Sequence, residues 1–255
     1  MDALITAGGF PSEDDPFFKY TLGKSEALAE VGGKPMIQWI LDAVGESSKI
    51  NNVVIVSLDD STGLTCKKPI HYVSHQGGMI DNIKAGTEKI VEINQDAKYV
   101  LAIASDIPAI TTEMVDWLVD TCRETDDDLY YNIIERAVME KRFPGANRTY
   151  TKLKGVELCG GDMNVFTTSS VVAQEGLWNK LEANRKKPLK QVAMVGIDNL
   201  LLIALRLITP EQAAARISKR IGMKARAIRC PYAEIAMDAD KAEQLELLIK
   251  DFESR

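Results

Sequence analysis

Residues 99–104 read YVLAIA and residues 53–56 read VVIV, two apolar runs with the length of single β-strands. Strands that are apolar along their whole length are typical of parallel sheets covered on both faces. The pattern continues along the first half, where short β-branched runs alternate with stretches of helical periodicity: Ala3–Thr6, Met36–Val44, Val53–Ser57, Ile80–Ile93, Tyr99–Ala104 and Glu113–Cys122. This βαβαβα order predicts an α/β fold, a Rossmann-like, mostly parallel sheet with flanking helices.

The rhythm changes after Asp126. Two further strands are expected at Leu129–Glu135 and Thr149–Leu158, around a loop that contains Pro144, Gly145 and Asn147. From Ser169 the chain is expected to be mainly helical, up to a last strand near Arg226–Cys230 and a closing helix over Asp240–Phe252. No repeat or low-complexity linker marks a boundary, so we expect one domain over residues 1–255 with an elaborated C-terminal half.

Composition excludes several classes of protein. The 255 residues are 45% hydrophobic, which is ample for a core, and the net charge of −6 argues against a broad nucleic-acid surface. The four cysteines form no CxxC pair, which favours reduced thiols in a cytoplasmic protein. The N-terminus lacks the layout of a signal peptide, and no transmembrane segment is expected. The most apolar stretch, 192–208, is interpreted as a buried or interface helix, because it carries charged residues.

The first predicted strand ends in LITAGG, Leu4–Gly9. Glycine lets a backbone turn closely around a ligand, and the N–H groups of such a turn can cradle a phosphate or read a nucleobase. The same two glycines also fit an ordinary tight turn. The continuation, GKSEALAEVGGKPMIQWILDAV over residues 23–44, strengthens the indication that this turn binds a ligand.

Together these segments resemble the start of the MobA-like nucleotidyltransferase superfamily, which has a glycosyltransferase-A-type fold. The family opens with a strand ending in A-G-G, here Ala7, Gly8 and Gly9, and continues to G-K-P-[LM]-[IL], here Gly33–Ile37. The resemblance implies that Ala7, Gly8 and Gly9 bind the nucleotide. It also implies that residues 1–125 form a nucleotide-binding half and residues 126–255 an acceptor-binding and closing half.

One position departs from the family pattern. Glu26 stands where the family has its triphosphate-binding lysine, and the loop Arg-Met-Gly is replaced by SEDDPFFKYTLG. Two like charges about 5 Å apart repel by roughly 3 kcal/mol at an effective dielectric near 20, so Glu26 cannot simply take over that role. Lys24 is the first candidate to steady the triphosphate, and Lys19 is the second; Lys24 can equally be an ordinary solvated lysine.

A metal site is predicted after Tyr99–Ala104, where the chain continues as SDIP and places Asp106 at the carboxyl end of the third predicted strand. Strand-end carboxylates face the ligand crevice of a parallel sheet, and a hard oxygen ligand suits Mg²⁺. The string matches the family's D-x-P metal motif, although Asp-x-Pro is also ordinary turn chemistry. The resemblance implies a second carboxylate near the C-terminus: Asp238 is assigned to the metal and Asp240 to the cap of the last helix, with the two roles exchangeable.

Two glycine-containing segments remain. Residues 74–86, SHQGGMIDNIKAG, stand where relatives read the nucleobase and ribose, which implies binding roles for Gly77, Gly78 and Asn82. Residues 159–166, CGGDMNVF, resemble the acceptor side of relatives, so Asp162 and Asn164 are candidates to meet the second substrate. Each segment is equally compatible with a turn that binds nothing. The two histidines, His71 and His75, lie in no recognisable catalytic context and are expected to be edge-strand or loop residues.

These residues predict Mg²⁺-dependent transfer of a nucleotidyl group from an NTP to a small phosphorylated acceptor. Two alternatives stay open: a nucleotide-binding or regulatory protein that has lost turnover at Glu26, and a glycosyltransferase that uses a nucleotide sugar. The second usually carries D-x-D where this chain has SDIP. The stretch 192–208 fits a homodimer interface, an acceptor pocket or core, and neither the base nor the acceptor is identified.

Overall fold

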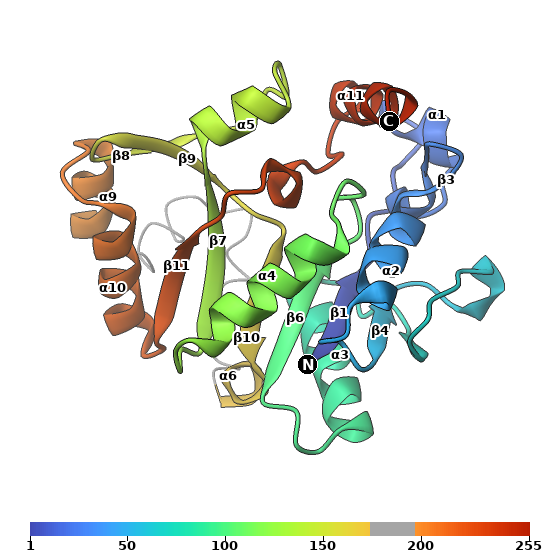
Figure 1. The fold of residues 1–255 in the computed structure, drawn as a ribbon, viewed down its shortest axis with the longest axis horizontal. Coiled ribbons are helices and arrows are strands. Elements are labelled where there is room, and N and C mark those ends of the chain that lie inside the picture. Colours follow the sequence, from blue (N-terminus) through green and yellow to red (C-terminus); the bar gives the residue numbers. More distant parts are fainter. Residues whose placement is uncertain (174–196) are drawn as a thin grey trace.

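A nine-stranded mixed sheet runs through the computed structural model, which describes residues 1–173 and 197–255 (Figure 1). The strand order is β5-β4-β1-β6-β10-β7-β9-β8, and β11 pairs with β7 off this path. The strands of this sheet are β1 (Asp2–Thr6), β4 (Val53–Val56), β5 (Ile70–Val73), β6 (Tyr99–Ala104), β7 (Leu129–Glu135), β8 (Thr151–Leu153), β9 (Val156–Gly160), β10 (Met163–Thr167) and β11 (Ala225–Arg229). A two-stranded hairpin is formed by β2 (Glu30–Val31) and β3 (Lys34–Pro35).

Helices flank the sheet on both faces. They are α1 (Phe18–Thr21), α2 (Met36–Glu46), α3 (Met79–Ile93), α4 (Thr112–Arg123), α5 (Arg136–Arg142), α6 (Thr168–Ala173), α9 (Ile197–Ala204), α10 (Pro210–Ile221) and α11 (Ala242–Glu253). Short 3-10 turns lie at η1 (Glu26–Leu28), η2 (Asp60–Thr62) and η3 (Ala233–Ala236). Local chemistry sets the ends of α10: Thr209 and Gln212 form a capping box, Pro210 starts the helix, and Gly222 ends it at φ 71°.

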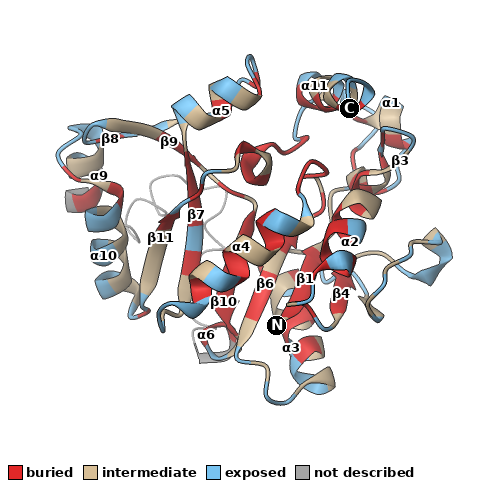
Figure 2. Cartoon of the chain, in the orientation of Figure 1, coloured by how far each residue is buried: buried red, intermediate tan, exposed pale blue. Residues whose placement is uncertain are grey.

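The N-terminal half is the predicted parallel sheet. β1 pairs in parallel with both β4 and β6, and β4 pairs in parallel with β5. Successive side chains of a strand point to opposite faces, and the burial follows this rule. Ala3 and Ile5 join the large core under α2 and α4, whereas Leu4 packs with Val54 and Val56 in a smaller core under α3. Figure 2 shows these central strands buried. Both faces are therefore covered, which explains the unbroken apolar runs.

The C-terminal half extends the same sheet with mixed directions. β10 lies antiparallel between β6 and β7, and β7 continues into antiparallel pairing with β9. β8 and β9 form a hairpin, and β11 returns parallel to β7. The sheet is continuous from the N-terminal half to the C-terminal half, because β6 and β10 are hydrogen-bonded neighbours.

Most predicted elements are confirmed, with three corrections. The segment Ile70–Val73 is an additional strand, so the strand before Asp106 is the fourth of the parallel strands and not the third. The expected strand Thr149–Leu158 is a β8–β9 hairpin. The closing helix begins at Ala242, and Lys241, not Asp240, is its N-cap, with the Lys241 N–H donating to Gln244 Oε1 at 3.1 Å.

The apolar stretch 192–208 lies only partly within the described residues. Its described part includes α9, which packs near β8 and α10. Leu201, Leu205 and Leu207 are exposed there, and Ile208 is buried. This stretch is therefore only partly core, and its residues 192–196 lie outside the described residues. None of the helices described in 1–173 and 197–255 has the length and apolar character that crossing a membrane requires.

We predict that Gly86→Ala destabilises the fold by about 1–3 kcal/mol, the usual cost of overpacking. Gly86 lies where α3 meets the sheet, and a Cβ there would be 2.2 Å from Leu4 Cδ1 and 2.9 Å from Val56 Cγ2. Urea unfolding measures the change. Glu88→Ala on the exposed side of the same helix is the control and should stay within about 0.5 kcal/mol of the wild type. Equal stabilities for the two variants would contradict the close packing of α3.

Candidate functional site

A cavity of about 300 Å³ opens at the carboxyl ends of β1 and β6, beside the start of α3. It brings together six of the residues predicted from the sequence: Gly8, Gly9, Gly77, Gly78, Asn82 and Asp106. The rest of its lining is Thr6, Glu26, His75, Met79, Ala104 and Ser105. We call it the nucleotide cavity. Its position matches the rule that ligands of open α/β sheets bind beyond the carboxyl ends of the strands.

The glycine turn after β1 is closely packed by side chains. A Cβ on Gly9 would lie 2.2 Å from Glu26 Oε2, so a larger residue here would require the Glu26 side chain to move. Ala7, also predicted to bind the nucleotide, is fully buried and belongs to the turn's scaffold: its N–H donates to Val56 O at 3.0 Å and its carbonyl accepts from Ser25 Oγ at 2.8 Å. The turn therefore presents Gly8 and Gly9 to the cavity and uses Ala7 as an anchor.

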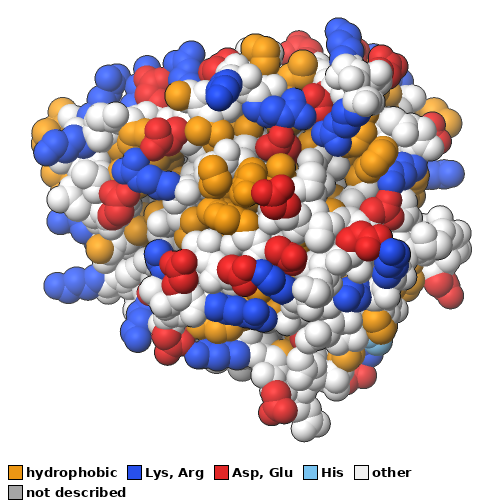
Figure 3. Space-filling view, in the orientation of Figure 1, with side chains coloured by type: hydrophobic (Ala, Val, Ile, Leu, Met, Phe, Trp, Pro, Cys, Tyr) orange, Lys and Arg blue, Asp and Glu red, His pale blue; other side chains and the backbone are white. Residues whose placement is uncertain are grey.

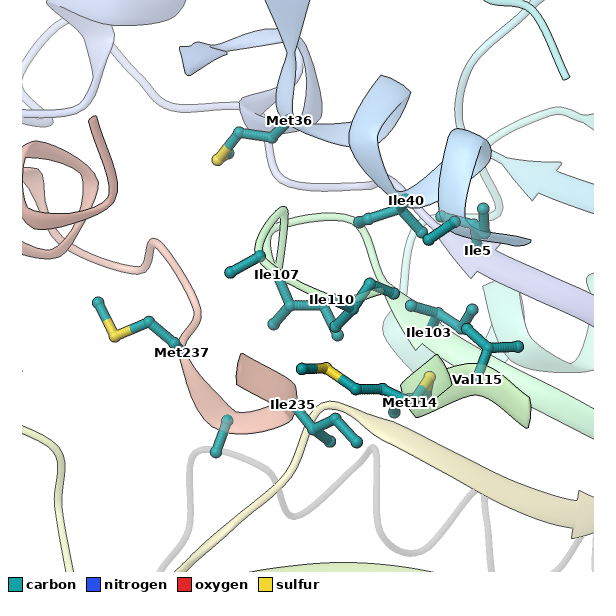
Figure 4. Packing of buried hydrophobic residues seen from close by; sticks show 14 of the residues in the cluster. Ile5, Met36, Ile40, Ile103, Ile107, Ile110, Met114, Val115, Ile235 and Met237 are labelled. Carbon is teal, nitrogen blue, oxygen red and sulfur yellow. The ribbon is translucent and has the colours of Figure 1, made fainter. Parts of the chain in front are cut away.

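Asp106 is held rigidly at the end of β6. The residues after it are core: Ile107 and Ile110 are buried and pack between α2 and the segment of Ile235 and Met237 (Figure 4). The backbone carbonyl of Asp106 accepts from Ala239 N at 3.1 Å. Its Oδ1 is buried and has no hydrogen-bond partner among the described residues. Burial raises the pKa of Asp106 well above its ordinary value, and nearby carboxylates raise it further.

A second cavity of about 320 Å³ lies in the C-terminal half, and its lining includes Asp238 and Asp240, the neighbours of Ala239, whose N–H donates to the Asp106 carbonyl. We call it the acceptor-side cavity; its lining is Tyr131, Asn147, Arg148, Thr149, Cys159, Gly160, Asp162, Asp238, Asp240, Lys241 and Gln244. Asp238, predicted as the second metal ligand, therefore lies here and not in the nucleotide cavity. Asp238 and then Asp162 are the charges that raise the pKa of Asp106 most, so these carboxylates form one electrostatic cluster.

Arg148 neutralises part of this cluster. Its guanidinium donates to Asp238 Oδ1 and lies 3.5 Å from Asp162 Oδ2, and its side chain is largely buried. Burial nevertheless raises the pKa of Asp238, and burial with the Asp238 charge raises the pKa of Asp162 to about 7. Arg148 thus binds Asp238 and lies close to Asp162, and the acids of the cluster outnumber this one arginine among the described residues.

The donor set fits Mg²⁺. Among the described residues no group of three or more His, Cys, Asp or Glu is placed to hold a metal ion by itself. Mg²⁺ does not need such a cage, because it usually takes one or two carboxylates together with phosphate oxygens and water. The unpartnered Oδ1 of Asp106, next to a cavity with room for a ligand, is the kind of oxygen such an ion uses. Asp238 is less free, because it already binds Arg148.

The lysines predicted to hold the triphosphate do not line the nucleotide cavity. Lys24 is exposed, and Lys19 lies 4.0 Å from Glu246 and over the ring of Tyr20. Glu26 lines the cavity and is half-buried; burial and then the charges of Asp15 and Asp240 raise its pKa. The described lining contains no Lys or Arg, so a bound triphosphate would meet two acids there. The role of Lys24 remains a prediction.

The predicted acceptor residues separate into two kinds. Asp162 lines the acceptor-side cavity, as anticipated. Asn164 is engaged in structure: its Oδ1 accepts from Asn132 N at 2.8 Å and its Nδ2 donates to Gly161 O at 2.8 Å.

Three residues that line the two cavities are not predicted from the sequence. His75, expected to be a loop residue, lines the nucleotide cavity, and Arg148 and Tyr131 line the acceptor-side cavity. No spacing signal marks Arg148, since it reaches the acids across the fold from a loop. His75 had a signal, because it stands two residues before Gly77.

Another hollow, of about 520 Å³, lies on the face where Figure 3 shows hydrophobic side chains gathered among charged ones. Its lining includes Ala137, Pro231 and Ala233. Arg142, which also lines this hollow, forms an ion pair with Glu234 at 2.7 Å and is hydrogen-bonded to Asp251. These contacts tie α5 to η3 and α11, so the charges of Arg142 and Glu234 in this hollow are already paired with each other or with Asp251.

The fold recurs in solved structures. A hypothetical transferase from Thermus thermophilus is 30% identical, with a TM-score of 0.80 over 96% of this chain and 98% of that one. CMP:2-keto-3-deoxy-manno-octonic acid synthetase complexed with CTP is 11% identical, with a TM-score of 0.60 over 100% of this chain and 98% of that one. 4-Diphosphocytidyl-2C-methyl-D-erythritol synthase from Anaerococcus prevotii is 12% identical, with a TM-score of 0.59 over 99% and 95% of the two chains.

No curated protein matches the chain significantly. A family model does: the MobA-like NTP transferase domain matches residues 3–192, well over half of the sequence. The resemblance drawn from AGG and GKPMI is thereby confirmed. The chain belongs to the MobA-like NTP transferase domain family.

Proposed function

We propose that this protein transfers a nucleotidyl group from an NTP to a phosphate-bearing acceptor, releases pyrophosphate and depends on Mg²⁺. One observation carries the proposal: the Oδ1 of Asp106, buried and without a hydrogen-bond partner among the described residues, lies beside a glycine-lined cavity and is coupled electrostatically to acids that line a second, polar cavity. An NTP in the first cavity and an acceptor in the second would then meet at this acid. Family membership supports the same class of reaction.

Each residue has a distinct task in this proposal. Asp106 would hold Mg²⁺, and the ion would neutralise charge on the phosphate oxygens. Gly8 and Gly9 would offer backbone N–H groups to the nucleotide, which they can approach closely for want of a side chain. Arg148 and Lys241 are the basic residues of the acceptor-side cavity and would face the acceptor's phosphate. The protein would thus act through positioning and electrostatics.

Mg²⁺ is especially important to this proposal because of Glu26. The described lining of the nucleotide cavity is acidic, so a triphosphate needs a cation to enter it. The same observation favours a second candidate function: a protein that binds a nucleotide and has lost turnover. The two candidates differ in whether pyrophosphate is released, and the following variants separate them.

We predict that Asp106→Asn lowers the rate of pyrophosphate release about 10²-fold or more, as loss of a key electrostatic group commonly does. The measurement is pyrophosphate release from each of the four NTPs with Mg²⁺. Asp96→Asn, at an exposed turn after α3, is the matched control and should keep the wild-type rate. An unchanged rate in Asp106→Asn would remove the metal assignment.

We predict that Glu26→Lys tightens binding of the Mg²⁺–NTP complex about 10-fold or more, because it replaces a like charge by an opposite one beside the phosphates. Titration calorimetry measures the affinity, and Glu26→Gln, which only removes the charge, should fall between. A rise in turnover together with affinity would support the candidate that lost its activity, whereas a fall in turnover would give Glu26 a positive role. Unchanged affinity would show that Glu26 does not face the triphosphate.

We predict that the metal-free protein loses stability as the pH rises through about 7, the pKa of Asp162. A carboxyl whose pKa is raised in the folded state takes up its proton on folding, so its protonated form stabilises the fold and ionisation removes that gain. The slope is at most about 1.4 kcal/mol per pH unit for one proton. Asp162→Asn should reduce the slope of stability against pH in urea unfolding between about pH 4 and pH 7 in EDTA, where this carboxyl is protonated in the folded protein and ionised in the unfolded chain, whereas Glu88→Gln should leave the slope unchanged. A wild-type slope in Asp162→Asn would contradict the assignment.

A further inference from the structure

The His75 ring is fixed in the wall of the nucleotide cavity by two polar neighbours. Its Nδ1 lies 2.8 Å from Ser57 Oγ and 3.3 Å from Asn82 Nδ2. The edge of Phe10 packs against the same ring, with centroids 5.8 Å apart. The side chain is nonetheless exposed, because its remaining surface faces the cavity and its mouth.

These neighbours fix the tautomer of His75. The buried Asn82 side chain is oriented by the N–H of Gln76, which donates to Asn82 Oδ1 at 2.8 Å. Asn82 therefore presents its amide nitrogen, a donor only, to His75. The Ser57 hydroxyl can also donate. His75 Nδ1 must then be the acceptor, and the proton lies on Nε2.

The backbone around His75 is shaped to this arrangement. Ser57, at the end of β4, has a φ of 82°, a left-handed conformation that a residue with a side chain rarely adopts. Gly8 makes room for the group: a Cβ there would lie 3.0 Å from Asn82 Nδ2, 3.2 Å from Ser57 Oγ and 3.3 Å from His75 Cε1. Strain of this kind persists where the surroundings enforce it, commonly at ligand sites.

We infer that His75 reads the nucleobase, through donation from Nε2–H to a ring nitrogen or carbonyl oxygen at the base edge; this rests on the proposed function. One N–H donor at a fixed position can pair with a single acceptor atom at the edge of a base. The surroundings suit a planar ring as well, because Gly77 and Gly78 add no side chain and Met79 offers an exposed apolar one. A fixed donor accepts a base with an acceptor at that point and rejects one with an amino group there.

Two variants test the two ring nitrogens of His75 separately. His75→Asn keeps an acceptor near the Nδ1 position and loses the Nε2 donor, whereas His75→Gln carries an amide donor near the Nε2 position. We expect wild type to prefer one class of NTP in the presence of Mg²⁺. His75→Asn should weaken binding of the preferred NTP about 10-fold, which is the effect of one hydrogen bond. It should also reduce the differences in affinity among the four NTPs. His75→Gln should recover part of the loss.

Inorganic tripolyphosphate with Mg²⁺ is the probe that lacks a base. Its affinity should be equal in wild type and His75→Asn, and equal weakening of tripolyphosphate and NTP would overturn base reading in favour of a phosphate contact. Gln76→Ala, whose side chain lies outside the cavity lining, is the matched control and should bind as wild type does. Urea unfolding verifies that both His75 variants fold.

The outcomes separate this inference from the proposed function. Base-selective NTP binding that is unchanged in His75→Asn would overturn the role of His75 and leave the proposed function standing. Absence of NTP binding to wild type would overturn both. Loss of selectivity in His75→Asn without loss of tripolyphosphate binding supports the role of His75.

Discussion

The central constraint on this molecule is electrostatic: largely buried carboxylates are gathered at one edge of the sheet, and among the described residues Arg148 is the arginine bonded to them. Burying a charge is costly unless it is paired or coordinates a cation. Arg148 contacts Asp238 and lies 3.5 Å from Asp162 Oδ2, but Asp106 Oδ1 and Asp162 Oδ2 are both buried without a hydrogen-bond partner among the described residues. The fold tolerates this because the loop after Asp106 is anchored in the core by Ile107 and Ile110. Packing thus keeps carboxylates close together although they repel one another.

The two cavities divide the charges unequally. Basic groups lie on the acceptor side, at Arg148 and Lys241, whereas the described lining of the nucleotide cavity carries only acids as charged groups. In most phosphate sites the protein supplies the cation through Lys, Arg or a helix terminus. In the proposed function that task would pass to an ion, and Glu26, packed against Gly9, is part of the reason. The affinity of such a site would follow the metal concentration more steeply than that of a lysine-based site.

The sequence predicted the parallel half of the fold well, because its signals are local. The apolar runs VVIV and YVLAIA are strands buried on both faces, and the helices between them keep a clear period. The β5 strand was missed because IHYV is short, half-buried and lies at the sheet edge, so it lacks the apolar run of its neighbours. The C-terminal order could not be predicted, since the placement of β10 between β6 and β7 is a long-range pairing.

The site was predictable where a motif carries the chemistry. Strand ends and glycines located Gly8, Gly9, Gly77, Gly78, Asn82 and Asp106 around one cavity. Arg148 and the separation of Asp238 from Asp106 into adjoining cavities depend on three-dimensional packing, for which no local pattern exists. Lys24 was selected by its position in the chain, and the turn that follows α1 leaves its side chain exposed.

The backbone around the acids has a mechanical consequence. Ala104 N donates to Asp162 O at 2.9 Å, Asp162 N donates to Ile235 O at 2.8 Å, and Ala239 N donates to Asp106 O at 3.1 Å. These bonds stitch β6, the start of β10 and the chain after η3 into a seam that runs between the two halves. A hinge that parted the halves would have to break this seam. Closure over substrates by peripheral loops would leave these bonds intact and the spacing of the acids unchanged.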